Sequence, residues 1–345
     1  MVDPTNRATT PAPRTTFSRR EVLGVGGALL LGGGIAATLR WAARQGTDLL
    51  ADVFIGKAPD YRADLANVIR GGLSALGITR DEVHGKRVLL KPNLVETARG
   101  EEHINTNPAV VVAAAEVFRS LDAADVFVAE GQGHRRDSWL VLDESGMGAA
   151  LDEAGLAFID LNHDDVARVP NAGRWTRMQH LYLPRTLLDA DWVVSMPKLK
   201  THHWAGVTCA MKNLFGVMPG IIYGWPKNVL HVHGISESIL DINATVKPAL
   251  TIVDAVVGME GDGPIMGTPK PLGALVMGRN FPAVDATCTR LMGLNPLGVP
   301  YLEKASNRLG PVHEDAIAQR GETIEALKAP FAIIDMPHLR GVAKG

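Results

Sequence analysis

Short apolar runs alternate with amphipathic segments through most of this chain, and that alternation limits the folds available to it. Strands are expected at residues 88–90, 125–129, 156–160, 192–195, 250–257 and 272–277. Helices are expected at residues 61–76, 108–121, 138–154, 234–246 and 282–292. Elements in this order predict an α/β fold with a doubly wound, mostly parallel sheet.

Three segments are expected along the 345 residues. Residues 1–45 form an export signal or N-terminal anchor, residues 46–246 an α/β domain, and residues 247–345 a smaller α/β domain. Within the second segment, residues 46–60 are interpreted as a connector. The ligand site is expected in the cleft between the two α/β domains, where small molecules often bind.

The N-terminal segment resembles a twin-arginine export signal, with Arg19 and Arg20 ahead of a Gly-rich apolar run at residues 22–39. That run is about 18 residues long, which is marginal for a bilayer span. The alternatives are therefore cleavage and retention as a membrane anchor. The expected partner is the twin-arginine export machinery, and the expected location is the periplasm or the outer face of the cytoplasmic membrane.

Composition excludes several classes of function. The net charge of −2 and the aromatic content of 5% give no support to nucleic-acid binding. The two cysteines, Cys209 and Cys288, are too few to hold an iron–sulfur cluster, which needs about four protein ligands. No iron–sulfur cluster is therefore expected.

Polar clusters directly follow three of the expected strands, at residues 91–93, 130–135 and 198–203. In a doubly wound sheet the loops after the carboxyl ends of the strands form the ligand site, so we expect these clusters to converge. The third cluster lies within residues 191–234, where five glycines and three prolines interrupt the chain and indicate loops.

Imidazoles that can bind a transition metal or exchange protons near pH 7 come from four histidines on these loops: His202, His203, His231 and His233. The alternative is that they are surface histidines without a ligand. Glu130 and His134 flank a glycine turn, either as an acid–base or ligand pair or as ordinary turn residues. No HExxH or paired CxxC motif is present, so the spacing selects no particular metal.

Side chains that can hold a phosphate, a carboxylate or a cofactor are the second feature of these loops. The candidates are Lys91, Asn93, Lys198, Lys200, Lys212 and Asn213. Lys212 lies between apolar segments, where a lysine is costly without a partner, and its amine can also act as a nucleophile. The alternative for the lysines is a solvated surface. The expected ligand is a small anionic substrate.

Several motifs of the chain look like those of the DUF362 family, whose activity is not generally established. They are KPNLVE (91–96), NTNPAVV (106–112), EGQGH (130–134), MPKLKTH (196–202), MKNLFG (211–216) and DAVVGMEGDGP (254–264). Many members of that family carry cysteine-rich ferredoxin segments, which this chain lacks. The resemblance therefore implies no iron–sulfur role here.

A more remote resemblance is to the lactate racemase family, whose members use a nickel-pincer nucleotide. The motif at residues 133–135 is similar to that family's G-x-H-R, and residues 202–212 are similar to its H-x-x-A-G followed by lysine. The resemblance implies a two-domain arrangement in which Lys212 anchors the cofactor and His231 ligates nickel. It assigns exchange of the substrate proton to His134 and His202. Cys209-Ala210-Met211 replaces the family's glycine pair.

The sequence therefore predicts an exported enzyme that depends on a metal or metallocofactor and racemises or epimerises a small hydroxy acid or similar anion. His134 and His202 are the expected catalytic residues, and the expected metal ligands are His231, His203 and His233. The metal, nickel or another divalent transition metal, is left open. The alternatives are a non-catalytic ligand-binding or maturation protein of the cell envelope, or an electron-transfer accessory protein.

Overall fold

Ten strands form the central sheet of the computed structural model, which describes residues 50–133, 137–306 and 308–343. They are β1 (Ala51–Lys57), β2 (Arg87–Pro92), β3 (Asp125–Glu130), β4 (Phe158–Asp160), β7 (Trp192–Met196), β8 (Lys198–His202), β9 (Gly206–Thr208), β10 (Leu250–Glu260), β11 (Thr268–Gly278) and β12 (Ile317–Gly321). A separate ribbon pairs β5 (Val166–Pro170) with β6 (His180–Pro184).

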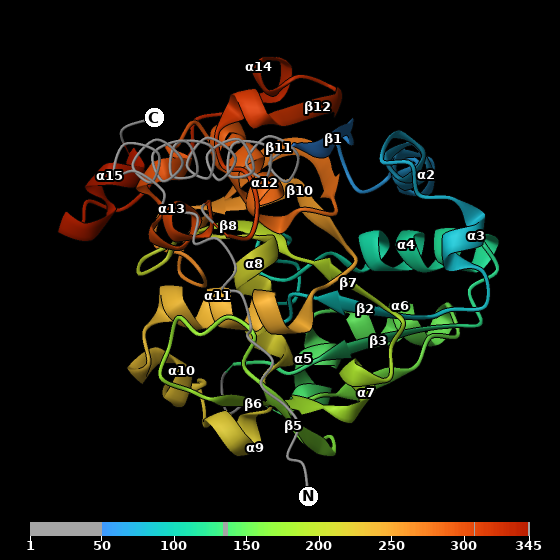
Figure 1. Ribbon diagram of the computed structural model, residues 1–345. Coiled ribbons are helices and arrows are strands. Elements are labelled where there is room, and N and C mark those ends of the chain that lie inside the picture. Colours follow the sequence, from blue (N-terminus) through green and yellow to red (C-terminus); the bar gives the residue numbers. More distant parts are fainter. Residues whose placement is uncertain (1–49, 134–136, 307, 344–345) are drawn as a thin grey trace, which may run out of the picture. The chain divides into compact units, whose positions relative to one another are not determined.

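The strands of the central sheet follow the order β12-β1-β11-β10-β7-β2-β3-β4, and β8 pairs with β10 and β9 (Figure 1). The pairings β1–β11, β10–β11 and β8–β9 are antiparallel. The other pairings of this sheet are parallel. The predicted α/β fold with a mostly parallel sheet is therefore confirmed.

Helices cover both faces of the sheet, and side-chain alternation along the strands explains why both faces are apolar (Figure 1). Val88 and Leu90 of β2 belong to one core and Leu89 to the other, because successive side chains of a strand point to opposite faces. The first core packs against α2 (Leu65–Ala75), α4 (Pro108–Ser120), α5 (Ser138–Glu144) and α6 (Met147–Glu153). The second packs against α8 (Ala210–Asn213), α11 (Ile235–Val246), α12 (Phe281–Leu291) and α13 (Pro300–Ala305).

Shorter elements complete the described structure. The helices are α3 (Arg80–Val83), α7 (Arg185–Leu188), α9 (Gly220–Tyr223), α10 (Asn228–Val232), α14 (Ile324–Leu327) and α15 (Arg340–Ala343). The 3-10 turns are η1 (Leu214–Val217), η2 (Pro296–Gly298), η3 (Glu314–Ala316) and η4 (Pro337–Leu339).

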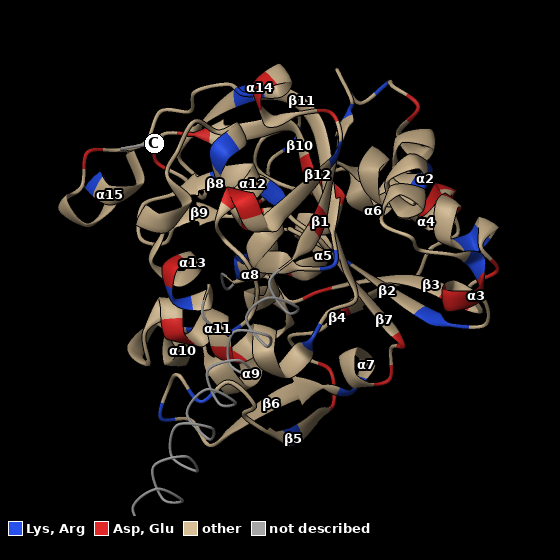
Figure 2. Ribbon diagram, turned by 45° about the horizontal axis from the view of Figure 1, so that its top comes forward, with Lys and Arg blue, Asp and Glu red and all other residues tan. Residues whose placement is uncertain are grey.

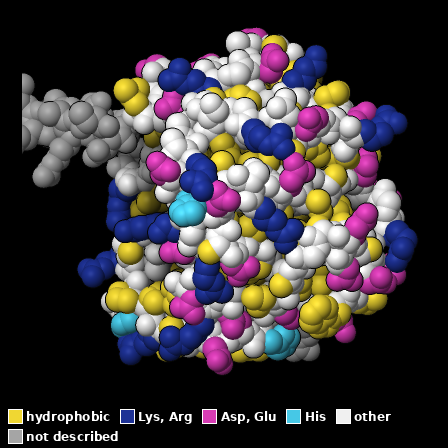
Figure 3. Space-filling model, turned by 90° about the vertical axis from the view of Figure 1, so that its right-hand side faces the viewer, with side chains coloured by type: hydrophobic (Ala, Val, Ile, Leu, Met, Phe, Trp, Pro, Cys, Tyr) yellow, Lys and Arg dark blue, Asp and Glu magenta, His cyan; other side chains and the backbone are white. Residues whose placement is uncertain are grey.

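Charges of both signs are mixed over the outside of the described elements (Figure 2). Figure 3 shows the same mixture on the side of the molecule where α2 and α3 lie. Exposed ion pairs on these elements include Arg70 with Glu116, at 2.7 Å between Nη2 and Oε1. Such exposed pairs contribute little to stability. The mixture of signs agrees with the nearly balanced charge of the chain, which is −2.

The structure differs from the expectation at β1, which occupies part of the predicted connector 46–60. Val53 and Ile55 are buried while Asp52 and Lys57 are exposed. This strand lies between β11 and β12, both more than 200 residues away in the sequence. The predicted helix 138–154 is instead two helices, because Gly146 adopts a left-handed φ of 72° between α5 and α6.

The predicted boundary between residues 246 and 247 falls at the end of α11, where Lys247 has a φ of 50°. The sheet continues across it, because Leu250 and Thr251 of β10 pair with Val194 and Ser195 of β7. Residues from 50 onward thus form one compact unit around one sheet. The smaller segment 247–345 contributes β10, β11 and β12 to it.

Two predictions lie outside the described residues, namely the export signal or anchor at residues 1–45 and the catalytic residue His134. Among the residues that are described, no helix has both the length and the apolar character needed to cross a bilayer.

Candidate functional site

A cavity of about 670 Å³ lies where the three polar clusters at the ends of β2, β3 and β7 meet. Four lysines line it, and they come from the end of β2, from β8, from α8 and from the turn before α10: Lys91, Lys200, Lys212 and Lys227. Three of the described histidines line it as well: His202, His203 and His231. The structure therefore brings together most of the residues that the sequence singled out.

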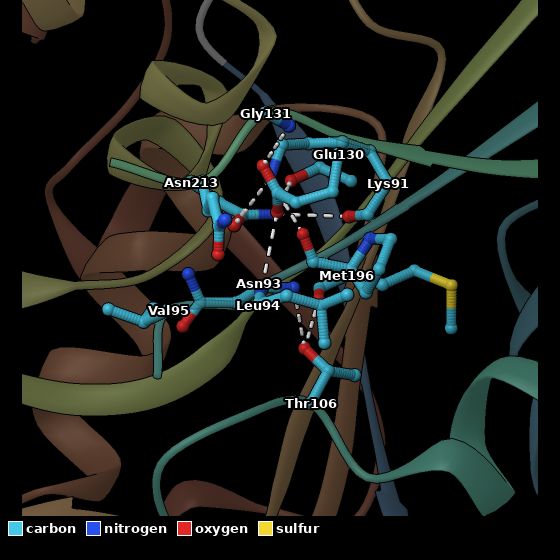
Figure 4. Close-up of polar contacts among 12 residues, drawn as sticks. Lys91, Asn93, Leu94, Val95, Thr106, Glu130, Gly131, Met196 and Asn213 are labelled. Atoms are coloured by element: carbon cyan, nitrogen blue, oxygen red, sulfur yellow. Dashed lines mark hydrogen bonds and ion pairs between the residues drawn. The ribbon is translucent and has the colours of Figure 1, made fainter. Parts of the chain in front are cut away.

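Lys91 is held within the protein by a buried ion pair with Glu130 (Figure 4). Its ammonium also donates to Asn213 Oδ1 at 3.1 Å and to the Pro92 carbonyl at 2.6 Å. The Asn213 amide in turn donates to the Lys91 carbonyl and to Ser195 Oγ. These bonds join the ends of β2 and β3 to α8, so Lys91 and Asn213 form the frame of the site.

Gly216 lies directly against this ion pair. A Cβ at this position would overlap Glu130 Oε1 and Lys91 Nζ. The Gly216 carbonyl also accepts a hydrogen bond from Gly131 N at 2.8 Å. A side chain is therefore excluded here by the close approach of the chain to the ion pair, not by backbone conformation.

The other three lysines of the cavity have no carboxylate within ion-pairing distance among the described residues. Lys200 is fully buried and donates to the Pro264 carbonyl at 3.2 Å. Lys212 lies over the Phe215 ring, with 3.8 Å between Nζ and the ring centroid. Lys227 is 2% exposed and donates to neutral oxygens.

Burial makes these ammonium groups unusually acidic. It lowers the pKa of Lys212 to about 8 and that of Lys227 to about 7. The pKa of Lys200 lies well below its usual value because of burial and then of repulsion by Lys198 and Lys212. The carboxylate of Glu130 offsets only part of the effect of burial on Lys200 and Lys227. Removing a charge from water without a paired counterion costs several kcal/mol, so an anion in the cavity would stabilise all three lysines.

Lys198, predicted to bind a cofactor, lies outside the cavity. Its ammonium donates to Asp254 Oδ2 at 2.6 Å and to the Tyr61 hydroxyl at 2.7 Å, and its side chain is fully buried. Asn93 lines the cavity, and its Oδ1 atom is buried without a hydrogen-bond partner in the described structure.

The cavity histidines lie in different surroundings. His202 is 6% exposed, and its Nδ1 accepts hydrogen bonds from the backbone N–H groups of Trp204 at 3.0 Å and Ala205 at 3.3 Å. His231 makes a contact of 3.0 Å from Nδ1 to the Lys227 carbonyl. Burial lowers the pKa of both rings, most strongly that of His202.

The three predicted metal ligands are not gathered at one point. His203 Nδ1 lies 3.4 Å from Asp262 Oδ1, and His233 is exposed and does not line the cavity. Within the described parts of the chain, no three His, Cys, Asp or Glu side chains form a group that could hold a metal ion. A metal held by this chain's own described side chains therefore does not fit. Lys212 and His231, which the racemase resemblance assigned to a cofactor, do share the cavity.

Sequence reasoning missed Lys227 and Asp285. Lys227 lies four residues before His231, within the stretch already singled out, but nothing local distinguishes it from a surface lysine. Asp285 of α12 accepts hydrogen bonds from Ala210 N at 2.8 Å and Met211 N at 3.2 Å, which positions α8 and hence Lys212. Burial raises the pKa of Asp285 to about 7.

Comparison with known proteins identifies relatives without an assigned activity. The family described as "Domain of unknown function (DUF362)" matches residues 88–290. The "Thylakoid-associated protein sll1697" of Synechocystis sp. (strain ATCC 27184 / PCC 6803 / Kazusa) is 29% identical over 230 residues, 66% of this chain and 68% of that protein.

Two solved structures show weaker likeness. The lactate racemase apoprotein from Thermoanaerobacterium thermosaccharolyticum is 14% identical with a TM-score of 0.43, over 70% of this chain and 57% of that chain. A protein from Thermotoga maritima is 12% identical with a TM-score of 0.34, over 72% of this chain and 58% of that chain. The chain thus spans less than two thirds of either structure. The DUF362 match covers more than half of this chain, which therefore belongs to the DUF362 family.

Proposed function

We propose that this protein binds a small organic anion in the lysine–histidine cavity and moves a proton on it, as a racemase- or epimerase-like isomerase. The observation that carries the proposal is the set of three cavity lysines without a carboxylate partner in the described structure: Lys200, Lys212 and Lys227. A ligand carboxylate or phosphate would supply the missing negative charge.

The local arrangement favours an exogenous anion over a structural role for these lysines. Two other buried lysines form ion pairs with carboxylates of the protein: Lys91 with Glu130, and Lys198 with Asp254. Both pairs have side chains that are at most 3% exposed. Among the cavity lysines, Lys200 and Lys227 are buried as deeply and Lys212 is half-buried, yet all three line open volume.

Proton transfer is supported by the histidines that line the same cavity. Imidazole is the side chain best suited to exchanging protons near neutral pH. An anion fixed by the lysines would bring a neighbouring carbon or hydroxyl group to His202 and His231. Negative charge that develops on the ligand during deprotonation would be stabilised by the same lysines, so the chemistry can be derived from the chain's own side chains.

Binding is tested by calorimetric titration of the full-length protein at pH 7 with glycolate and, separately, with inorganic phosphate. Saturable binding of glycolate alone identifies a carboxylate site, and binding of phosphate alone a phosphate site. We expect Lys200→Met to weaken the binding and the matched control Lys57→Met, at an exposed lysine of β1, to leave it unchanged. Absence of binding by both anions would overturn the proposal.

Catalysis is tested separately by incubating the protein with glycolate, lactate and glycerate in D₂O. We expect deuterium to replace the hydrogen on the hydroxyl-bearing carbon of one of them, and His231→Gln to abolish this exchange. Binding without exchange of any of the three would favour the alternative of a non-catalytic ligand-binding protein.

Export by the twin-arginine machinery is part of the same proposal and rests on Arg19, Arg20 and the apolar run that follows. Cell fractionation of the native host tests it. We expect the protein outside the cytoplasm, either released or attached to the outer face of the cytoplasmic membrane. The double substitution Arg19→Lys and Arg20→Lys should retain it in the cytoplasm, and equal export of that variant would contradict the assignment.

A further inference from the structure

The two histidines proposed for proton transfer, His202 and His231, have opposite hydrogen-bonding roles at Nδ1. Two backbone N–H groups, from Trp204 and Ala205, point at Nδ1 of His202. A backbone N–H can only donate, so this Nδ1 must present its lone pair. The proton of the neutral ring therefore lies on Nε2, which has no hydrogen-bond partner among the described residues.

His231 has the reverse arrangement. Its Nδ1 contacts the Lys227 carbonyl at 3.0 Å, and a carbonyl oxygen can only accept. Nδ1 must therefore carry the proton, which leaves the lone pair of the neutral ring on Nε2. The Trp204 and Phe215 rings pack edge-on against the imidazole, each with 5.9 Å between ring centroids, and hold its orientation.

We propose that the cavity has a fixed polarity, in which His202 donates a hydrogen bond from Nε2 and His231 accepts a proton or a hydrogen bond at Nε2. The matching ligand carries an oxygen acceptor for His202 and a hydroxyl or other protonated group for His231. Together with the anionic group for the lysines, this describes a small hydroxy-carboxylate or hydroxy-phosphate. The anionic part rests on the proposed function, whereas the polarity rests on the hydrogen bonds alone.

The polarity gives the two histidines different roles. His231 can gain a proton on Nε2 and still donate from Nδ1 to Lys227, so uptake of a proton breaks no bond. His202 would have to break both of its backbone hydrogen bonds to become an imidazolium. The expected catalytic residue His202 is thus assigned to stabilising negative charge on a ligand oxygen, and His231 to accepting the proton.

The resulting step is balanced without an oxidant or reductant. Nε2 of His231 has a single lone pair, so in the reacting complex the C–H group takes the place of the hydroxyl group there. The C–H bond of the bound anion breaks, its proton moves to Nε2, and its electron pair remains on the ligand as an enolate-type oxyanion. The Nε2–H group of His202 donates to that oxygen. Return of the proton from His231 to the ligand restores the neutral imidazole.

The polarity is tested by NMR of the full-length protein labelled with ¹⁵N in its histidine rings, recorded without ligand. Long-range ¹H–¹⁵N correlations identify which ring nitrogen carries the proton. We expect Nε2–H for His202, Nδ1–H for His231, and a rapidly averaged mixture for the exposed control His233. The same tautomer in His202 and His231, or averaging in both, would overturn the proposal.

Assignment of the ring signals uses His202→Gln and His231→Gln, each of which removes one ring. Where a variant does not fold, correlations from the ring to the backbone amide of the same residue assign it in the unaltered protein. The measurement therefore decides the tautomers whether or not the substitutions are tolerated.

The ligand class is tested by titrating glycolate against acetate, which lacks the hydroxyl group. We expect glycolate to bind at least tenfold more tightly, and His231→Phe to remove this preference while acetate binding is kept. Equal affinities in the unaltered protein would overturn the hydroxyl assignment. Failure of both acids and of phosphate to bind would instead refute the proposed anion site, and the tautomers would still decide the polarity.

Discussion

Lys198 and Lys200 lie two residues apart on β8 and are both fully buried, yet the protein treats them differently. The Lys198 ammonium lies 2.6 Å from Asp254 Oδ2 and also donates to Tyr61 and to the Val257 carbonyl. Lys200 has the Pro264 carbonyl at 3.2 Å and then the open cavity. One charge is paired with a carboxylate by the fold, and the other has no carboxylate partner among the described residues.

The pairing of β8 with β10 explains the difference. Lys198 lies opposite Asp254 in this parallel pairing, and Lys200 lies opposite Met259 because the register shifts between the two points. This pairing gives Lys198 a carboxylate opposite it and Lys200 an apolar residue. A buried lysine is consequently no evidence of a ligand site until its partners are known.

The largest expected effect is that of Lys198→Met on stability. It would leave the Asp254 carboxylate buried without its counterion, and removing one partner of a buried ion pair costs about 3–5 kcal/mol. Lys200→Met removes a charge that has no carboxylate partner in the described structure, so the free energy of unfolding should fall by less than about 1 kcal/mol or rise. Urea unfolding measures both, and equal losses in the two variants would refute the contrast.

The second expected effect is on ligand binding, where the order of the two lysines reverses. Charge-assisted hydrogen bonds contribute about 1.5–3 kcal/mol, so Lys200→Met should weaken binding of the anion found by calorimetry about 10- to 100-fold. The control Lys57→Met should bind as the unaltered protein does. If Lys200→Met kept full affinity, Lys200 would not be part of the anion site.

Local sequence patterns predicted the parts of the fold that depend on nearby residues. Helices α4 and α11 and strands β2, β3 and β7 lie within two or three residues of their expected positions. Their signals, apolar periodicity and a capping Asn107 ahead of a proline, are local. β1 was missed because its partners β11 and β12, which give it its place in the sheet, are distant in sequence.

The same distinction applies to the site. Lys91, Lys200 and His202 were expected together because each follows or ends a strand of one sheet, and parallel topology brings such positions to one edge. The sequence could not separate Lys198 from Lys200, because their difference arises from a strand register set about fifty residues further along the chain. It could not assign tautomers to His202 and His231 either, since these follow from backbone groups placed by the folded turns.

Gly216→Ala tests a lysine that is paired within the protein, because Gly216 lies against the ion pair of Lys91 and Glu130. The added Cβ would push apart Lys91 and Glu130, and overpacking of this kind costs about 1–3 kcal/mol. We expect a lower urea midpoint and weaker anion binding, because Lys91 also holds Asn213 of α8 next to Lys212. The matched control is Gly71→Ala, because the added Cβ would meet only a side-chain carbon at 3.9 Å. Gly77→Ala is unsuitable, because Gly77 has a left-handed φ of 68°.

The smallest expected effect is the change in the free energy of unfolding per pH unit. Its sign shows whether the charges of the cavity lysines are compensated within the protein. The pKa is about 7 for Lys227 and about 8 for Lys212 in the folded protein, against about 10.4 when unfolded. Between these values the unfolded chain binds more protons, so the lysines make the free protein more stable as pH rises, by at most about 1.4 kcal/mol per pH unit for each.

Anion affinity should change in the opposite direction, because the ligand requires the protonated lysines and they lose their protons as pH rises through 7 and 8. Calorimetry and urea unfolding between pH 6.5 and about 9 should therefore show binding that weakens while the stability of the free protein increases. Lys212→Met and Lys227→Met should each flatten both curves. Parallel curves would mean that the cavity lysines are already compensated within the protein, as Lys198 is, and that the cavity is not an anion site.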